Sequence, residues 1–197
     1  PVTLISRSNL ASALSGQARY AEAEAEHRAV LAIRERAQGA EHPDTLLTRN
    51  KLANVLNAQG KNAEAEAGLR TVLAISERTL GPEHRATIGA RMNLASILRE
   101  QGKHAEAEAE QRAVLASMKH VLGPEHPGTL VCRVNLANAL HNQNNNVEAE
   151  AEFRETLAIM RRVLGPEHPE TLNCLSNLAT MQQAQGKRTE TESELQA

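Results

Sequence analysis

The sequence has almost no aromatic side chains: its 197 residues include no Trp, one Tyr at Tyr20 and one Phe at Phe153. A hydrophobic core must therefore consist of Leu, Val, Ile and Ala, whose short side chains let helices approach one another closely. The net charge is also small, because 22 Lys and Arg nearly balance 24 Asp and Glu and leave −2. The two signs are mixed throughout the chain, so we expect no nucleic-acid partner and no attraction to an acidic membrane surface.

Long apolar runs are missing as well. No stretch approaches the roughly 18 consecutive apolar residues that a membrane-spanning helix requires. No stretch has the arrangement of a secretory signal peptide either. The sequence therefore predicts a protein without a membrane partner.

What the sequence does contain is one segment repeated with small changes. Residues 85–126 return at intervals of 42 residues in both directions. The equivalent leucines are Leu10, Leu52, Leu94, Leu136 and Leu178, and an alanine follows each of them. A fixed period of this size is the signature of a solenoid of stacked helical units. We divide the chain into a single array of repeats at 1–42, 43–84, 85–126 and 127–168, with a partial repeat at 169–197. The array begins inside the repeat period and stops part-way through a helix, so we expect a fragment of a longer protein.

The two cysteines, Cys132 and Cys174, are one period apart. Equivalent positions of neighbouring helix pairs should lie two helix spacings, roughly 16–20 Å, from each other. A disulfide requires Cα atoms within about 7 Å, so we expect two free thiols. Free thiols fit a reducing compartment, and we predict a cytoplasmic protein.

Each repeat is predicted to form two antiparallel helices. In the second repeat the first helix should span about residues 43–58. The proline that opens it suits the first helical position, where its missing N–H has no partner to lose, and Asp44 suits the positive end of the helix dipole. Gly60 ends this helix as a C-cap. The second helix should span about residues 62–80 and end at Gly81, followed by a proline that cannot continue a helix.

The second helix of each repeat opens with an Ala-Glu alternation that has the period of a strand. Both residues favour helices and disfavour strands, so propensity outweighs the pattern. The spacing also places a glutamate four residues before an arginine, which is the favourable orientation for a helical ion pair. The four such pairs are Glu24/Arg28, Glu66/Arg70, Glu108/Arg112 and Glu150/Arg154.

Three short segments carry a likeness to a known family. Asn93-Leu94-Ala95, Gln101-Gly102-Lys103 and LGPEHPETL at residues 164–172 resemble the tetratricopeptide repeat, and more narrowly its 42-residue variety in kinesin light chains and many bacterial arrays. The likeness covers the whole chain. It implies an all-α, right-handed superhelical solenoid of about ten helices, in which the first helices of the pairs line a concave groove. It also implies a scaffold that holds a protein or peptide and that has no catalytic activity and no cofactor.

A histidine recurs in the connection between repeats, at His42, His84, His126 and His168. Zinc ligands must lie within about 2.1 Å of one ion. Stacked repeats separate equivalent residues by roughly 16–20 Å. We therefore predict loop residues at helix entrances and no metal site.

An arginine recurs three residues before the motif leucine, at Arg7, Arg49, Arg91 and Arg133. We call these four residues the arginine column. Their side chains either lie over the core and reach a neighbouring loop or a glutamate of a second helix, or they point toward a bound acidic peptide. We favour the first interpretation, and the sequence leaves the second open.

The groove-facing residues follow from the resemblance. If the family's geometry holds, they flank the motif leucine on the first helices: Asn50, Lys51, Asn54, Asn57, Met92, Asn93, Ser96, Arg99, Val134, Asn135, Asn138, His141 and Asn177. Asparagine dominates, and its side chain is both a donor and an acceptor, which suits the backbone of an extended peptide. The alternative is that a concave surface must be polar and that asparagine is merely tolerated there.

We therefore predict a scaffold that binds a protein or an extended peptide, with Lys51 and Arg99 favouring an acidic ligand. No nucleophile–base pair, glycine-rich phosphate loop or acid–base pair has the spacing that catalysis needs, so we expect no enzymatic activity. Two alternatives stay open. The array could self-associate through its ends, or it could be the sensor region of a larger bacterial signalling protein.

Overall fold

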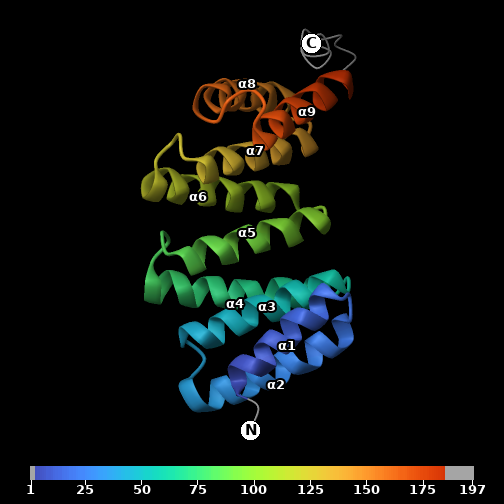
Figure 1. Ribbon diagram of the computed structural model, residues 1–197, viewed down its shortest axis with the longest axis vertical. Coiled ribbons are helices and arrows are strands. Elements are labelled where there is room, and N and C mark those ends of the chain that lie inside the picture. Colours follow the sequence, from blue (N-terminus) through green and yellow to red (C-terminus); the bar gives the residue numbers. More distant parts are fainter. Residues whose placement is uncertain (1–2, 185–197) are drawn as a thin grey trace. The chain divides into compact units, whose positions relative to one another are not determined.

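The computed structural model describes residues 3–184, and within them the chain is all-helical (Figure 1). Its helices are α1 (Leu4–Gly16), α2 (Tyr20–Gln38), α3 (Pro43–Ala58), α4 (Asn62–Leu80), α5 (Arg85–Glu100), α6 (His104–Leu122), α7 (Pro127–Asn142), α8 (Asn146–Val163) and α9 (Pro169–Ala184). The predicted all-α class is confirmed, with nine helices and no strand between residues 3 and 184. The tenth helix, expected at the end of the partial repeat, would fall on residues 185–197, outside the described part.

The chain forms two compact units, residues 1–102 and residues 103–197. In the first unit, α1 to α4 each pack against the next helix in sequence, and α3 also contacts α1 and α5. In the second unit, α6 to α9 pack in the same way, and α7 also contacts α9. We call α1, α3, α5, α7 and α9 the A helices and the others the B helices. Each unit therefore contains A helices that lie side by side.

The A helices begin where the sequence predicts, because α3, α5, α7 and α9 start at residues 43, 85, 127 and 169 and so keep the 42-residue interval. At each start, the Nδ1 atom of a histidine accepts a hydrogen bond from the backbone N–H two residues later. The four bonds are His42 with Asp44 (3.2 Å), His84 with Ala86 (3.2 Å), His126 with Gly128 (3.1 Å) and His168 with Glu170 (3.2 Å). The recurring histidines therefore satisfy N–H groups that a helix start leaves unpaired.

The B helix α4 ends at a glycine, as predicted. Gly81 has a φ of 87°, which side-chain-bearing residues rarely adopt. Its N–H donates to the carbonyl of Glu77 at 3.1 Å, which completes the last turn of α4. The chain then enters the connection that leads to His84 and α5.

The cores of both units are aliphatic, as the shortage of aromatic residues predicts. Leu69 and Leu94 in the first unit and Leu130 and Leu140 in the second have exposed fractions of 0%. The alanine after the motif leucine is also buried in the first four repeats, as at Ala53 with 1% exposure. Truncating one of these leucines to alanine would cost about 2–5 kcal/mol.

Ion pairs cover the solvent side of the B helices. The four predicted pairs are present, at 2.9 Å for Arg28–Glu24, Arg70–Glu66 and Arg154–Glu150 and at 2.7 Å for Arg112–Glu108. Arg28 and Arg112 also reach the next B helix, where they pair with Glu64 (2.5 Å) and Glu148 (2.6 Å). Exposed helical pairs contribute only about 0.3–0.5 kcal/mol each. The aliphatic core therefore supplies most of the stability.

Cys132 and Cys174 are buried and free, as predicted from their spacing. Burial raises the pKa of the Cys174 thiol to about 11 and also raises the pKa of the Cys132 thiol. The Cys174 thiol donates a hydrogen bond to the carbonyl of Phe153 at 3.7 Å. Both thiols are therefore protonated at neutral pH and are poor nucleophiles.

Candidate functional site

The predicted groove residues of the first unit lie on α3 and α5, which contact each other. Asn93 on α5 donates a hydrogen bond from Nδ2 to Oδ1 of Asn50 on α3, at 2.7 Å. Within residues 3–184, neither the Asn50 NH₂ group nor the Asn93 side-chain oxygen has another partner. We call these two residues the amide pair. It offers one donor and one acceptor, the combination that a peptide backbone requires.

A cavity of about 580 Å³ lies beside the amide pair, between α3 and α5. Its walls include Leu47 and Met92, whose exposed fractions are 53% and 38%. Gly89 also lines the cavity, at the position equivalent to Leu47 one repeat later. A Cβ added at Gly89 would meet no atom within 4 Å. The missing side chain therefore leaves part of this space open.

Two other predicted residues of the first unit connect A helices. The Lys51 ammonium group donates to the Ser12 hydroxyl on α1 at 3.2 Å. The Asn57 side chain donates to the Glu100 carboxylate on α5 at 3.4 Å. The remaining residues are Asn54 and Arg99, which are exposed, and Ser96, which is half-buried. Lys51 and Asn57 thus have structural partners, whereas Asn54 and Arg99 are accessible to a ligand.

In the second unit the predicted residues lie on α7 and α9. Asn135, Asn138 and Asn177 are half-buried, and His141 places Nδ1 2.8 Å from Oδ1 of Asn146. Val134 differs from the prediction, because its side chain is 5% exposed and is not presented at the surface. Burial of an aliphatic side chain stabilises the fold. Asn50, at the equivalent position, instead forms a hydrogen bond with Asn93. The second unit therefore offers a shorter row of polar groups than expected.

The arginine column is engaged by glutamates of the B helices. The ion pairs are Arg7–Glu26 at 2.8 Å, Arg133–Glu152 at 2.9 Å, Arg133–Glu155 at 2.7 Å, Arg49–Glu35 and Arg91–Glu77. The side chain of Arg133 is buried, and its hydrogen bonds to Glu155 and Glu152 raise its pKa. The same contact lowers the pKa of Glu155. These pairs agree with the interpretation that we favoured, in which the column holds A and B helices together.

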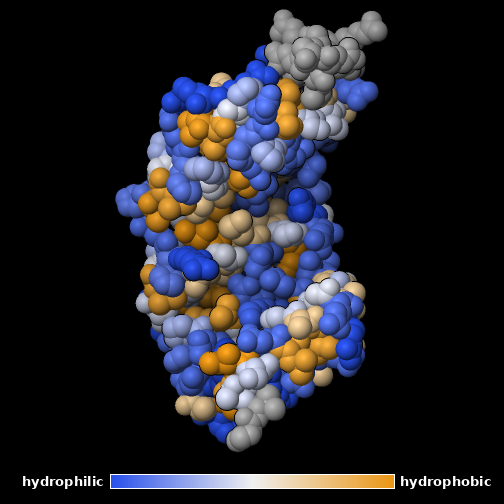
Figure 2. All heavy atoms as spheres, in the orientation of Figure 1, coloured by the Kyte–Doolittle hydropathy of each residue, from blue (hydrophilic) through white to orange (hydrophobic). Residues whose placement is uncertain are grey.

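Potential metal ligands do not cluster in the described residues. Between residues 3 and 184, no group of three or more His, Cys, Asp or Glu side chains could hold a metal ion. In the same part of the chain, no helix combines the length and the apolar character that crossing a membrane demands. Figure 2 shows hydrophobic side chains as separate patches among polar ones on the visible face.

The cavity between α3 and α5 was not predicted, although one position of the repeat pointed to it. One column of the repeat contains Ile5, Leu47, Gly89, Val131 and Asn173. Gly89 is the one member of this column without a side chain, so it marks a place where side-chain volume is missing. Only the packing of α3 beside α5 shows that the missing side chain leaves a cavity.

The sequence also gave no reason to single out His27. It stands where Leu69 and Phe153 stand in other repeats, and it is 1% exposed. Its Nδ1 is buried without a hydrogen-bond partner. Burial lowers the pKa of His27, and the nearby charge of Lys51 lowers it further, while Glu26 opposes the shift. His27 is therefore a polar substitute at a core position.

Helix pairs that recur at a constant interval, with a polar A-helix face, define a helical repeat protein. The sequence profile of the tetratricopeptide repeat matches residues 2–67, 47–109, 87–162 and 133–192. The chain belongs to the tetratricopeptide repeat family. A comparison with curated proteins finds no match.

Solved structures place the chain near kinesin light chain-like repeats. A putative kinesin light chain from Podosopora anserina with nearly identical TPR-like repeats is 30% identical, with a TM-score of 0.89 over 98% of this chain and 92% of that chain. BtubC (BKLC) from P. vanneervenii is 21% identical, with a TM-score of 0.82 over 95% and 75%. A Rap protein complexed with Competence and Sporulation Factor is 13% identical, with a TM-score of 0.68 over 93% and 49%. The last two similarities concern the fold alone.

Proposed function

We propose that this protein-interaction scaffold binds an extended peptide on the A-helix face of α3 and α5. The observation that carries the proposal is the amide pair, Asn50 and Asn93, beside an open cavity. The free donor and acceptor of the pair bind the peptide backbone. The cavity receives one side chain of the peptide.

The cavity suits an apolar side chain. Its volume of about 580 Å³ lies within the roughly 300–1,000 Å³ that ligand pockets typically have. Leu47 and Met92 remain exposed there, and a ligand side chain that covers them removes apolar surface from water. Methionine is flexible and adapts to side chains of different shape. The site therefore selects for size and apolar character more than for one residue type.

Charge favours acidic residues elsewhere in the peptide. Asp44 and Arg85 both line the cavity, so their charges offset each other. Lys51 and Arg99 lie further along α3 and α5 and add positive charge. The arginine column adds no free positive charge at this face, because each of its arginines is paired with a glutamate of a B helix. An acidic residue is therefore favoured outside the cavity.

The family supports this assignment. Tetratricopeptide repeats typically act as scaffolds without enzymatic activity, and the proposal contains no catalytic step. A protein of the same fold, the Rap protein, is known in complex with Competence and Sporulation Factor, so a partner is compatible with this helix arrangement. The free buried cysteines fit a reducing compartment, and location in the cytoplasm is part of the proposal.

Fluorescence anisotropy with a library of extended peptides tests the proposal. Peptides that carry a large apolar residue near acidic residues should bind best. Asn50→Ala combined with Asn93→Ala should weaken binding about tenfold or more, which corresponds to about 1.4 kcal/mol. A library without any binder, or binding that is unchanged in this double variant, would refute the site.

A second variant tests the cavity separately. Gly89→Leu supplies the side chain that Leu47 has at the equivalent position, and it should remove the preference for a large apolar residue. Ala74→Leu, at an exposed position of α4, is the matched control and should bind like the wild type. Equal binding by both variants would show that the cavity receives no ligand side chain.

A further inference from the structure

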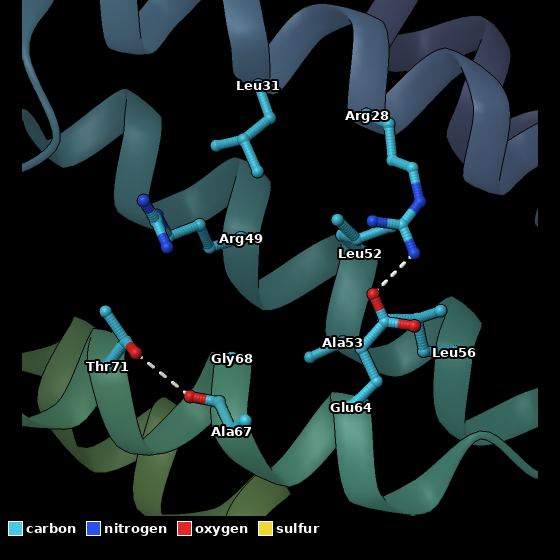
Figure 3. A pocket seen from close by; sticks show the side chains of 10 residues that line it. All are labelled: Arg28, Leu31, Arg49, Leu52, Ala53, Leu56, Glu64, Ala67, Gly68 and Thr71. Carbon is cyan, nitrogen blue, oxygen red and sulfur yellow. Dashed lines mark hydrogen bonds and ion pairs between the residues drawn. The ribbon is translucent and has the colours of Figure 1, made fainter.

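A second pocket lies in the first unit, among α2, α3 and α4, and shares no lining residue with the cavity between α3 and α5. Its volume is about 310 Å³. Figure 3 shows Arg49 on one side of it and the Arg28–Glu64 ion pair on the other, with Leu31 pointing in from α2. We call it the Arg49 pocket.

The other repeats show which group is missing from the Arg49 pocket. Gly68 on α4 lines the pocket, and the equivalent residues of the other repeats are Glu26, Glu110 and Glu152. In the first and fourth repeats, this glutamate accepts a hydrogen bond from Nε of the column arginine, at 2.8 Å for Arg7–Glu26 and 3.0 Å for Arg133–Glu152. Because residue 68 is a glycine, the same hairpin offers Arg49 no such carboxylate.

Arg49 has one ionic partner, and one of its donors is buried without an acceptor. A terminal nitrogen of its guanidinium pairs with Glu35 on α2. Its Nε is buried and has no hydrogen-bond partner. A buried N–H without an acceptor is unfavourable, and a guanidinium forms its strongest hydrogen bonds with carboxylates. The open donor and the space above Gly68 therefore match the same group, a carboxylate.

The pocket has room for an aliphatic stem that carries this carboxylate. A Cβ added at Gly68 would lie 4.0 Å from the Cβ of Ala53, which is ordinary van der Waals contact. Leu31, Leu52 and Ala67 supply apolar walls. The two acidic side chains at the site are already paired, Glu35 with Arg49 and Glu64 with Arg28. A carboxylate in these apolar surroundings interacts more strongly with Arg49 than it would in water.

We propose that the Arg49 pocket binds a carboxylate on a short aliphatic stem, in the place that a glutamate fills in the first and fourth repeats. Arg49 Nε donates to the carboxylate, and the apolar walls surround the stem. The carboxylate comes from a glutamate side chain of a partner protein or from a small free carboxylic acid. The site is separate from the amide pair and its cavity, so the two proposals succeed or fail independently.

An NMR titration with butyrate and with blocked glutamate (the N-acetyl, N-methylamide derivative) tests the proposal. The reporter is the Nε–Hε signal of Arg49, assigned by its loss in Arg49→Lys. A saturable shift is expected, and neutral butyramide should bind at least about tenfold more weakly, because it lacks the charge that strengthens the bond. Saturation by blocked glutamate identifies a side chain as the source, and saturation by butyrate alone identifies a free acid. No saturable shift with either probe, or equal binding of butyramide, overturns the proposal.

Substitutions at residue 68 locate the binding. Gly68→Glu supplies the carboxylate within the chain, so it should abolish the probe-induced shift and move the Arg49 signal toward its bound position. Gly68→Ala adds only a Cβ and should retain binding. Arg36→Ala, at an exposed position of α2, should have no effect. Undiminished binding of the probes by Gly68→Glu would place them elsewhere on the protein and overturn the proposal.

Discussion

The Nδ2 atom of Asn93 on α5 lies 2.7 Å from Oδ1 of Asn50 on α3. The two asparagines are 43 residues apart in the sequence, and their hydrogen bond joins the two helices. This bond uses one half of each side-chain amide and leaves the other half free. An asparagine on this face can therefore support the structure and also contact a ligand. Stability and binding measurements must be combined to separate these two roles.

Asn93→Ala should lower the free energy of unfolding by about 1 kcal/mol, because it leaves the half-buried side-chain oxygen of Asn50 without its donor. Combining it with Asn50→Ala should cost less than the sum of the single changes, with a coupling of about 0.5–1.5 kcal/mol. Urea unfolding of the four proteins of this cycle measures the coupling. Strictly additive losses would show that the bond contributes nothing to stability.

His27 should make the first unit sensitive to mild acid. The unfolded chain binds a proton on this residue near pH 6.5, whereas burial lowers the pKa of His27 in the folded chain. The unfolded state therefore binds more protons in this range, and the free energy of unfolding falls as the pH falls from about 7 to 5. His27→Leu, which copies the core residue of the next repeat, should remove most of this loss.

Urea unfolding at several pH values measures the effect of His27. The control is His104→Asn, because asparagine stands at the equivalent positions Asn62 and Asn146. This control should keep the pH dependence of the wild type. If His27→Leu and the wild type lose stability in parallel, another group is responsible.

Glu24 should control stability at lower pH. Lys61 at 2.6 Å, together with Gln59 and Arg28, lowers the pKa of Glu24 to about 2, although burial opposes the shift. The stabilisation is fully present above about pH 4.5, is lost as the pH falls toward 2, and amounts to at most about 3 kcal/mol. Glu24→Gln should therefore destabilise the protein at pH 7. It should also weaken the dependence of stability on pH between about 4.5 and 2.

Thermal unfolding between pH 2 and 7 checks the role of Glu24. Glu22→Gln removes a much more exposed carboxylate that pairs with Arg19, and it should change stability much less, because solvent screens exposed ion pairs. Equal effects of the two substitutions would contradict a special role for Glu24.

The histidine N-caps predict a pair of opposite outcomes at one position. His84→Ala removes the acceptor for the Ala86 N–H and should cost about 1 kcal/mol. His84→Asp should retain the stability, because aspartate is a preferred cap and its charge suits the helix start. Calorimetric melting of both variants measures this difference. Equal destabilisation by both would show that the imidazole of His84 acts through something other than capping.

Local signals made the helices predictable. The limits of α3 and α4 match the predicted ranges 43–58 and 62–80, because proline at a start and glycine at an end act on their own helix. The pairs of glutamate and arginine four residues apart were predictable for the same reason. The interval of the histidines was visible too, but the capping bond depends on how each imidazole is turned.

Contacts between helices were not predictable from one residue at a time. Arg7 and Arg49 occupy equivalent positions, yet Arg7 pairs with the B helix of its own hairpin and Arg49 with the preceding one. The absence of a carboxylate at Gly68 does not explain the choice by itself, because Arg91 also pairs with the preceding helix although Glu110 stands on its own hairpin. Likewise, Val134 was expected at the surface because of its place in the repeat, but its apolar side chain is buried.

The hydrogen bonds and ion pairs between neighbouring repeats limit how the length of the chain can change in evolution. Arg28–Glu64, Arg78–Glu41 and Asn93–Asn50 join residues 36, 37 and 43 apart, which is close to one period. Duplicating one 42-residue unit in the gene would copy a donor and its acceptor together, so the inserted unit would find matching partners on both sides. A deletion of a few residues inside a unit would instead shift one partner out of reach. Such a protein should therefore gain and lose sequence in whole 42-residue units.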